Sequence, residues 1–368
     1  GQIEVCKIDA ENNEIKLEGV EFQIVNSKSE IVETIKTNEQ GIATTSRLPI
    51  GEYLIKETKT DENHILKEET IKVNVDTDKV SKIEIENERI KGKIKVIKTS
   101  SDNNLDNTIK AGDPIPNVEF EVFDTEGKFI EKIITNTEGI AITQKLDKGM
   151  YLLKEVKTGE GFVLNESDYW LEIKENNQIV EINITNEPEK PDVKIEKTGE
   201  IQTANKEEVR YDFNIQNTGN TSLDNFIWYD YLPYEYVKIN KIQTGTYNQN
   251  LNYNVYYKTN KNDYKLLAQN LNTLVINIID LEKITLQKDE TITEIKFDFG
   301  TVGKGFKSIA SSSIICNIKE NVKDGDSFTN RTRIEGKNKD ILVWDEDEHT
   351  IIVKQENLIE KKLPRTGF

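Results

Sequence analysis

Lysine, asparagine and acidic residues recur at strand positions where an alternating pattern predicts buried apolar side chains. Successive side chains of a strand point to opposite faces, so Ile3, Val5 and Lys7 share one face of the first predicted strand. Burying several such groups in one small core costs several kcal/mol unless they interact with one another. The residues placed in this way are the lysines Lys7, Lys98 and Lys197, the asparagines Asn87, Asn186 and Asn330, and the acids Glu57, Glu155 and Asp230.

Two kinds of chemistry would explain such a set. One is a buried salt bridge with an amide partner. The other is covalent: desolvation lowers the pKa of a lysine and raises that of a carboxyl, so a neutral amine attacks the asparagine carbonyl and ammonia leaves. A bond between Lys7 and Asn87 would close a loop of about 80 residues, for which the disulfide analogue predicts roughly 4–5 kcal/mol of stabilisation. A lysine that only extends to solvent is the remaining alternative, and it stays open for Lys197.

The chain contains an internal repeat that carries these residues twice. Two short segments recur with the same spacing, and the second copy has additional residues in its first loop. Two units of about 90–97 residues therefore follow one another. The matching segments are TNEQGIA at 37–43 with TNTEGIA at 135–141, GEYLIKE at 51–57 with GMYLLKE at 149–155, and GQIEVCK at 1–7 with GKIKVIK at 92–98.

The elements that must position these residues are strands. Each unit consists of short alternating runs separated by turn residues, and no helical periodicity persists. We therefore predict an all-β chain of three tandem β-sandwich domains. The first two span 1–89 and 90–188, a larger third domain spans 192–356 after a proline-containing linker, and 357–368 form a flexible tail.

Both repeats resemble the prealbumin-like (transthyretin-like) collagen-binding-protein B-type domains, or SpaA-type domains, of Gram-positive surface proteins. The similarity rests on the first-strand lysine, the GxYxLxE-like stretches at 51–57 and 149–155, and an Asn-Glu pair closing each repeat. In that family the lysine and asparagine form an intramolecular isopeptide bond, which the glutamate catalyses. The resemblance implies the sets Lys7, Glu57, Asn87 and Lys98, Glu155, Asn186. A Gly-aromatic pair that often follows the glutamate is present at 161–162 and is missing from the first repeat.

The third segment resembles the larger immunoglobulin-like repeats of such proteins. The similarity rests on NTGN at 217–220, the stretch Asp230–Pro233, and FTN at 328–330. Some of those repeats use aspartate as the catalyst. The resemblance implies the set Lys197, Asp230 and Asn330, with a domain that forms no bond as the alternative.

The chain ends in a pentapeptide that resembles the LPxTG sorting signal of sortase substrates. It consists of Leu363, Pro364, Arg365, Thr366 and Gly367. A protease-like cleft needs an extended, exposed peptide; Pro364 stiffens this one, and Gly367 leaves little bulk beyond the cleaved bond. The resemblance implies that a sortase joins Thr366 to peptidoglycan or to a pilin lysine, outside the cell.

Composition excludes several other classes of function. The net charge of −17 argues against a nucleic-acid partner, and two Cys and two His leave little material for zinc sites, disulfide frameworks or a Ser-His-Asp triad. The acidic stretches at 324–326 and 345–349 lack EF-hand spacing, so we expect solvated loops, no metal and no cofactor. The lack of any long apolar run argues against a membrane span.

We therefore expect a cell-wall-anchored stalk that presents an adhesive region and cross-links itself once, without enzymatic turnover. The alternatives are a minor or basal pilin subunit, or an adhesin that binds a host extracellular-matrix ligand through the aromatic residues near 228–236. A polymerising pilin shaft is disfavoured because no YPK-like motif is visible. A glycosidase would need two acids facing one cleft, and the inward acids lie in separate predicted domains.

Overall fold

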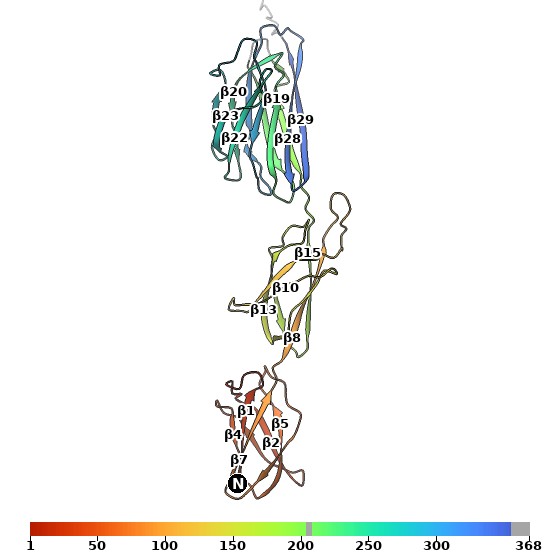
Figure 1. The fold of residues 1–368 in the computed structure, drawn as a ribbon, viewed down its shortest axis with the longest axis vertical. Helices are drawn as coiled ribbons and strands as arrows, with labels where there is room; N and C mark the ends of the chain where they lie inside the picture. Colours follow the sequence, from red (N-terminus) through yellow and green to blue (C-terminus); the bar gives the residue numbers. More distant parts are fainter. Residues whose placement is uncertain (204–207, 355–368) are drawn as a thin grey trace, which may run out of the picture. The chain divides into compact units, whose positions relative to one another are not determined.

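The computed structural model describes residues 1–203 and 208–354, and within these ranges the backbone forms strands and turns without a helix (Figure 1). The prediction of an all-β chain is confirmed. Contacts divide the chain into two compact units, Gly1–Pro188 and Glu189–Phe368. No helix long and apolar enough to cross a membrane occurs among the described residues.

The first sandwich packs a three-stranded sheet, β4-β1-β7, against a four-stranded sheet, β3-β2-β5-β6. Strands β1 and β7 run parallel, with Val5 opposite Ile83, so the first and last strands of the sandwich are neighbours. Inward side chains of both sheets, among them Phe22 and Ile55, form one apolar core. The strands are β1 (Gln2–Asp9), β2 (Glu21–Asn26), β3 (Ile31–Lys36), β4 (Ile42–Thr44), β5 (Gly51–Lys59), β6 (Ile71–Val75) and β7 (Val80–Asn87).

The second sandwich repeats this arrangement. Its sheets are β10-β9-β13-β14 and β11-β8-β12, and β15 pairs in parallel with β8. Every second residue of β8 is buried, which is the burial pattern expected of a strand with one face on the core. The strands are β8 (Lys91–Ser100), β9 (Glu119–Phe123), β10 (Phe129–Ile134), β11 (Ile140–Ile142), β12 (Leu146–Asp147), β13 (Gly149–Lys157), β14 (Asp168–Ile173) and β15 (Ile179–Asn186).

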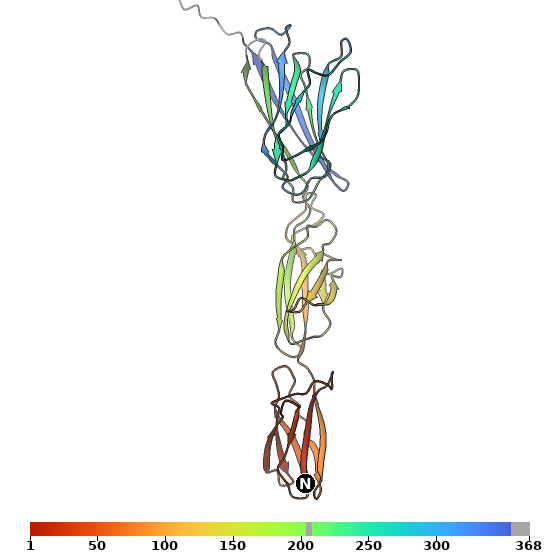
Figure 2. The ribbon, with the colours of Figure 1, turned by 90° about the vertical axis from the view of Figure 1, so that its left-hand side faces the viewer.

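The third sandwich is larger and has a different topology. A five-stranded sheet, β16-β18-β27-β20-β24, faces a seven-stranded sheet, β17-β29-β28-β19-β25-β22-β23, and β21 pairs with β26 (Figure 2). Its first strands are β16 (Val193–Gly199), β17 (Gln202–Thr203), β18 (Glu208–Asn217), β19 (Asp224–Tyr231), β20 (Val237–Gln243), β21 (Thr246–Tyr247) and β22 (Asn252–Thr259). The later strands are β23 (Lys265–Asn272), β24 (Ile278–Asp280), β25 (Ile292–Asp298), β26 (Ser308–Ala310), β27 (Ser312–Ile318), β28 (Ser327–Asn338) and β29 (Ile341–Val353).

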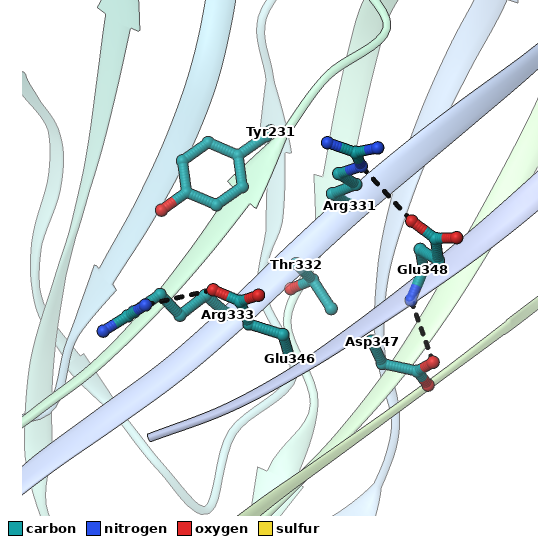
Figure 3. Close-up of a pocket in the computed structure, with 7 residues that line it drawn as sticks. All are labelled: Tyr231, Arg331, Thr332, Arg333, Glu346, Asp347 and Glu348. Atoms are coloured by element: carbon teal, nitrogen blue, oxygen red, sulfur yellow. Dashed lines mark hydrogen bonds and ion pairs between the residues drawn. The ribbon is translucent and has the colours of Figure 1, made fainter. Parts of the chain in front are cut away.

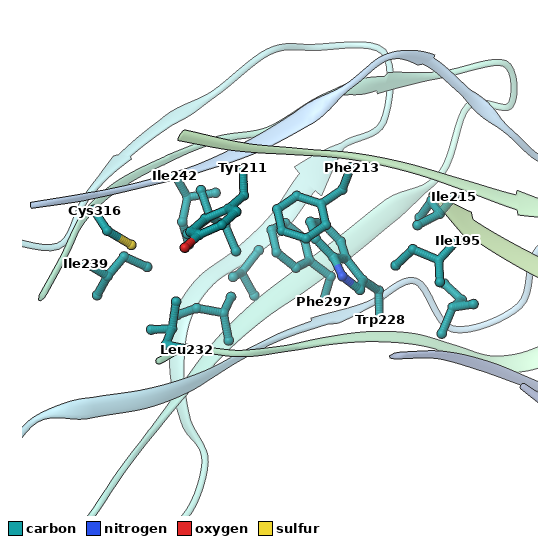
Figure 4. Packing of buried hydrophobic residues seen from close by; sticks show 14 of the residues in the cluster. Ile195, Tyr211, Phe213, Ile215, Trp228, Leu232, Ile239, Ile242, Phe297 and Cys316 are labelled. Atoms are coloured by element: carbon teal, nitrogen blue, oxygen red, sulfur yellow. The ribbon is translucent and has the colours of Figure 1, made fainter. Parts of the chain in front are cut away.

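Aromatic side chains fill the core of this third sandwich. Trp228 is fully buried and stacks on Phe297 with ring centroids 4.2 Å apart, and Phe213 lies against the same indole (Figure 4). The indole nitrogen of Trp228 donates a hydrogen bond of 2.7 Å to the Thr332 hydroxyl, which satisfies its polar atom. Trp228 is therefore a core residue and not part of a binding groove.

Candidate cross-linking sites

A lysine, an asparagine and a glutamate meet in the core of the first sandwich. Lys7 Nζ lies 2.6 Å from Asn87 Oδ1 and 2.8 Å from Glu57 Oε2. Asn87 Nδ2 donates a hydrogen bond of 2.6 Å to Glu57 Oε1. All three residues are buried, so the lysine and the carboxylate face each other away from water.

The second sandwich holds the same arrangement. Lys98 Nζ contacts Asn186 Oδ1 and lies 2.9 Å from Glu155 Oε2. Asn186 Nδ2 donates a hydrogen bond of 2.6 Å to Glu155 Oε1. The structure thus brings together both sets of residues singled out in the repeats.

The turn in the repeated TNxxGIA segments holds each lysine in place. Gly41 and Gly139 accept hydrogen bonds from the Lys7 and Lys98 amides, at 2.7 and 2.8 Å. Both glycines have positive φ, and a Cβ there would lie within 2.5 Å of the lysine carbonyl oxygens. Only glycine combines this conformation with so close an approach. The repeated glycine therefore sets where the lysine strand lies.

Strand pairing brings the asparagine to the lysine, and the glutamate reaches them from the opposite sheet. In the parallel β1–β7 pair, Lys7 lies opposite Ile85, so Asn87 follows two residues later on the same face. Glu57 alternates with Tyr53 and Ile55 on the inward face of β5, in the other sheet. The acid therefore contacts both partners from across the core.

Burial sets the protonation of the two lysines. Desolvation lowers the pKa of Lys7 and of Lys98 from the usual lysine value, although the glutamate beside each opposes the shift. A lowered pKa favours the neutral amine, which is the nucleophilic form. Each site thus combines a nucleophile, a carbonyl group and an acid–base residue in direct contact.

In the third sandwich an aspartate connects a lysine and an asparagine. Lys197 Nζ lies 2.9 Å from Asp230 Oδ1, and Asn330 Nδ2 donates a hydrogen bond of 3.1 Å to Asp230 Oδ2. Burial lowers the pKa of Lys197 and raises that of Asp230. The ammonium also lies 4.8 and 4.7 Å from the ring centroids of Tyr211 and Phe213, which Figure 4 shows inside the core. The solvent-exposed alternative for Lys197 is wrong, since its side chain is buried.

The third site is built differently from the first two. Asp230 and Asn330 lie on the neighbouring strands β19 and β28 of one sheet, while Lys197 comes from the other sheet. In the first two sandwiches the lysine and the asparagine are the neighbours. Asn330 Oδ1 is buried and lacks a hydrogen-bond partner among the described residues. Asp230, rather than the asparagine, is the direct partner of this lysine.

The acidic stretch at 345–349 is not the solvated loop that we expected. It lies within β29, and its carboxylates reach strand β16. Asp345 Oδ2 accepts a hydrogen bond from the Ile195 amide at 2.9 Å, and Asp347 Oδ2 accepts one from the Lys197 amide at 2.7 Å. These side chains satisfy backbone donors on the free edge of β16 and help to hold Lys197 in place.

Two threonines that contact the asparagines were not among the site residues predicted from the sequence. Asn87 Nδ2 donates a second hydrogen bond to the Thr60 hydroxyl at 2.9 Å, and Asn186 Nδ2 donates one to Thr158 at 2.8 Å. Both threonines come directly after the strand that carries the glutamate. The repeated KT at 59–60 and 157–158 was the available signal.

An ionic cluster lies beside the first site, and the residues that the structure describes at the corresponding places of the second sandwich do not repeat it. Buried Asp9 accepts hydrogen bonds from Arg89 Nε at 2.6 Å and from His64 Nε2 at 2.8 Å. At the corresponding places the second sandwich has Ser100, and Phe162 paired with Pro188. The two repeats therefore differ in the polar residues that lie beside their candidate cross-linking sites.

The outer face of the third sandwich carries a pocket of about 650 Å³ on strands β19, β28 and β29. Figure 3 shows Tyr231 along one side and two ion pairs, Arg331 with Glu348 and Arg333 with Glu346. The arginine–glutamate distances are 3.2 and 3.0 Å.

No group of His, Cys, Asp and Glu side chains suited to a metal ion occurs among the described residues. The LPRTG pentapeptide at 363–367 lies outside the described residues.

Comparison with known proteins places the repeats in a family. Residues 1–89 and 92–188 match the family described as SpaA, prealbumin-like fold domain. The trypsin-resistant surface T6 protein of Streptococcus pyogenes serotype M6 is 38% identical over 56 residues, which are 15% of this chain and 10% of that protein. The matched segment therefore spans only about a tenth of this relative's length.

Several solved structures are also similar, at low sequence identity. The Bacillus anthracis TIE protein is 22% identical with a TM-score of 0.45, over 83% of this chain and 49% of that protein. GBS52, the minor pilin of Streptococcus agalactiae, is 20% identical with a TM-score of 0.25, over 51% of this chain and 95% of that one. The major pilin subunit of Bacillus cereus is 16% identical with a TM-score of 0.26, over 72% and 69%. Because the family matches cover half of its residues, the chain belongs to the SpaA prealbumin-like fold domain family.

Proposed function

We propose that this chain is the stalk of a Gram-positive, wall-anchored surface protein, stabilised by lysine–asparagine isopeptide bonds inside its sandwiches. The observation that carries the proposal is the contact of each repeat's lysine with both the amide oxygen and the glutamate, in two independent copies. Membership in the SpaA family supports it. The stalk would hold an adhesive region away from the cell wall.

The reaction follows from the contacts in the second sandwich. Lys98 Nζ attacks Asn186 Cγ, so the Nζ–Cγ bond forms and the Cγ–Nδ2 bond breaks. The Glu155 carboxylate, whose Oε2 faces Nζ and whose Oε1 faces Nδ2, takes one proton from Nζ and then gives one proton to Nδ2. One Nζ proton stays on the new amide, and the nitrogen of the asparagine leaves as ammonia. Lys7, Glu57 and Asn87 would react in the same way.

The bonds would make the stalk resistant to force and proteases. The paired residues are 80 positions apart in the first sandwich and 88 in the second. By analogy with a disulfide, closing loops of this length stabilises each sandwich by roughly 4–5 kcal/mol. Because the bond joins the first and last strands, pulling on the chain ends would load the isopeptide bond rather than the hydrogen bonds of the sheet.

Attachment would proceed through the C-terminal pentapeptide. A sortase would cleave between Thr366 and Gly367 and join Thr366 to peptidoglycan or to a lysine of another pilin subunit. The chain would then act as a sortase substrate and as a self-modifying protein, not as an enzyme with turnover.

The test is the intact mass of the recombinant chain, followed by peptide mapping around Lys7, Lys98 and Lys197. The expected result is the loss of one ammonia for each bond, mapped to Asn87, Asn186 and Asn330. A loss of two would leave the third sandwich without a bond. The matched control is Lys98→Ala, which must restore the mass of one ammonia and remove only the second linkage. A chain with its full unreacted mass would overturn the covalent proposal.

A second candidate function is adhesion, either as a minor or basal pilin or as a host-matrix-binding domain. The pocket beside Tyr231 favours it, because an exposed ring flanked by paired charges suits a peptide or glycan ligand. Saturable binding to immobilised matrix proteins that is lost in Tyr231→Ala would support this function. Equal binding by the unmodified and Tyr231→Ala chains would remove the pocket from consideration.

A further inference from the structure

Each repeat holds its asparagine carboxamide by three polar contacts. The oxygen contacts the lysine, and the two Nδ2 hydrogens have separate acceptors, a glutamate oxygen and a threonine hydroxyl. The carboxamide group offers two donors on nitrogen and an acceptor on oxygen. Both nitrogen donors are therefore satisfied, and the orientation of the amide is fully determined.

The orientation of the carboxamide matters because its oxygen stays in the product and its nitrogen leaves. Oδ1 must carry the developing negative charge near the lysine, and Nδ2 must receive a proton from the glutamate and depart. The lysine and the glutamate each hold one end of the carboxamide, which leaves the second Nδ2 hydrogen to be accepted by another group. A second acceptor at Thr60 or Thr158 fixes the plane of the amide and keeps its nitrogen away from the lysine.

The threonines occupy equivalent places in the two repeats. Each lies three residues after the catalytic glutamate, just past the end of β5 or β13, and each is half-buried. The third sandwich offers a contrast. Among the residues that the structure describes, the Asn330 side chain has its hydrogen bond to Asp230 and no hydroxyl partner.

We propose that Thr60 and Thr158 are positioning residues for isopeptide formation, which hold the departing amide nitrogen against the glutamate while the lysine attacks. This inference rests on the proposed cross-linking chemistry of the same sites. The threonine neither gains nor loses a proton: its oxygen accepts a hydrogen bond from Nδ2 before and during the breaking of the Cγ–Nδ2 bond. The two sites serve as mutual controls because a substitution in one leaves the other unchanged.

The experiment measures the rate of cross-linking in the full chain. Unreacted protein is prepared from inclusion bodies in denaturant, refolded by dilution, and sampled over time for ammonia loss and for the linked peptides of each site. In Thr158→Val we expect the Lys98–Asn186 bond to form about tenfold to a hundredfold more slowly, as a misplaced reacting group would. The Lys7–Asn87 bond in the same molecules should form at its usual rate.

Two further variants separate positioning from a structural role. Thr158→Ser keeps the hydroxyl and should restore the rate to within about threefold, since the hydrogen bond is retained. Thr185→Val, on the exposed outward face of β15, is the matched control and should react at the unmodified rate. In a Lys98→Met, Glu155→Gln background, which cannot cross-link and leaves no buried charge unpaired, Thr158→Val should lower the thermal unfolding temperature only by the small amount expected for one lost hydrogen bond.

The outcomes distinguish this inference from the proposed function. If the unmodified chain loses no ammonia, both the cross-linking chemistry and the role of the threonines are overturned. If it does lose ammonia and Thr158→Val reacts equally fast, the role of the threonine alone is overturned. A Thr158→Ser variant as slow as Thr158→Val would also overturn it, because the hydroxyl would then not be the cause.

Discussion

Asn186 Nδ2 lies 2.6 Å from Glu155 Oε1, while the other oxygen of that carboxylate faces the lysine. One side chain thus touches both the nitrogen that must lose protons and the nitrogen that must gain one. A carboxyl in this position can transfer a proton between them without solvent. Its removal should therefore affect the chemistry more than the fold.

Glu155→Gln should slow the Lys98–Asn186 bond by about 10²–10⁴-fold, the usual contribution of a general acid–base group. Glutamine keeps the size and part of the hydrogen bonding of the side chain but cannot carry the proton. The measurement is ammonia loss after refolding, with the Lys7–Asn87 bond of the same chain as the internal control. Unchanged kinetics at the second site would show that Glu155 has no role in proton transfer.

Loss of a cross-link should lower the free energy of unfolding of its sandwich by roughly 4–5 kcal/mol. The suitable variant is Lys98→Met with Glu155→Gln, because removing the lysine alone would leave an unpaired buried carboxylate. Denaturant unfolding of this double variant, followed by fluorescence of Trp170 in the second sandwich, should show a transition that is absent or much later in the unmodified chain. Coincident transitions would contradict a stabilising covalent bond.

Much of the candidate site can be predicted from alternation, because each residue lies inside a strand. Lys7, Glu57 and Asn87 each follow apolar residues at intervals of two, which identifies their face without a structure. Thr60 and Thr158 lie just past a strand end, where alternation no longer applies. Their role depends on how the chain turns after the strand.

Other features of the sites depend on side-chain contacts between segments that are far apart in the sequence, and residue spacing does not predict these contacts. The acidic run containing Asp345 and Asp347 has the composition of a loop, yet it lies within the long strand β29, and its carboxylates accept hydrogen bonds from two amides of β16. Asp9 meets His64 and Arg89 at sequence separations of 55 and 80 residues. Only the three-dimensional closure of the sandwich brings these charges together.

In a third sandwich without an isopeptide bond, Asp230→Ala should lower the free energy of unfolding by about 3–5 kcal/mol, because it leaves the buried Lys197 ammonium without its direct partner. Replacing both residues, in Lys197→Met with Asp230→Leu, should cost much less than the single change, since no charge then remains in the core. Denaturant unfolding of the two variants tests the difference. A double variant less stable than Asp230→Ala would mean that the ion pair itself holds the sandwich together.

The Asp9 cluster should make the first sandwich more sensitive to acid than the second. Burial alone would raise the pKa of Asp9, but hydrogen bonds from Arg89 and His64 outweigh burial and hold that pKa well below the usual value of 3.8. A carboxyl with a depressed folded-state pKa stabilises the fold above its unfolded pKa, and the contribution is lost as the pH falls below that value.

Scanning calorimetry should therefore show the transition of the first sandwich falling in temperature between about pH 4 and pH 2, as the Asp9 contribution disappears. In Asp9→Ser this dependence should flatten, and stability at neutral pH should fall by on the order of 2 kcal/mol, the scale of hydrogen bonds to a charged group. The second sandwich, which has Ser100 at this place, is the control within the same molecule. Equal acid dependence of both sandwiches in the unmodified chain would contradict this prediction, because the second repeat has Ser100 in place of the buried Asp9.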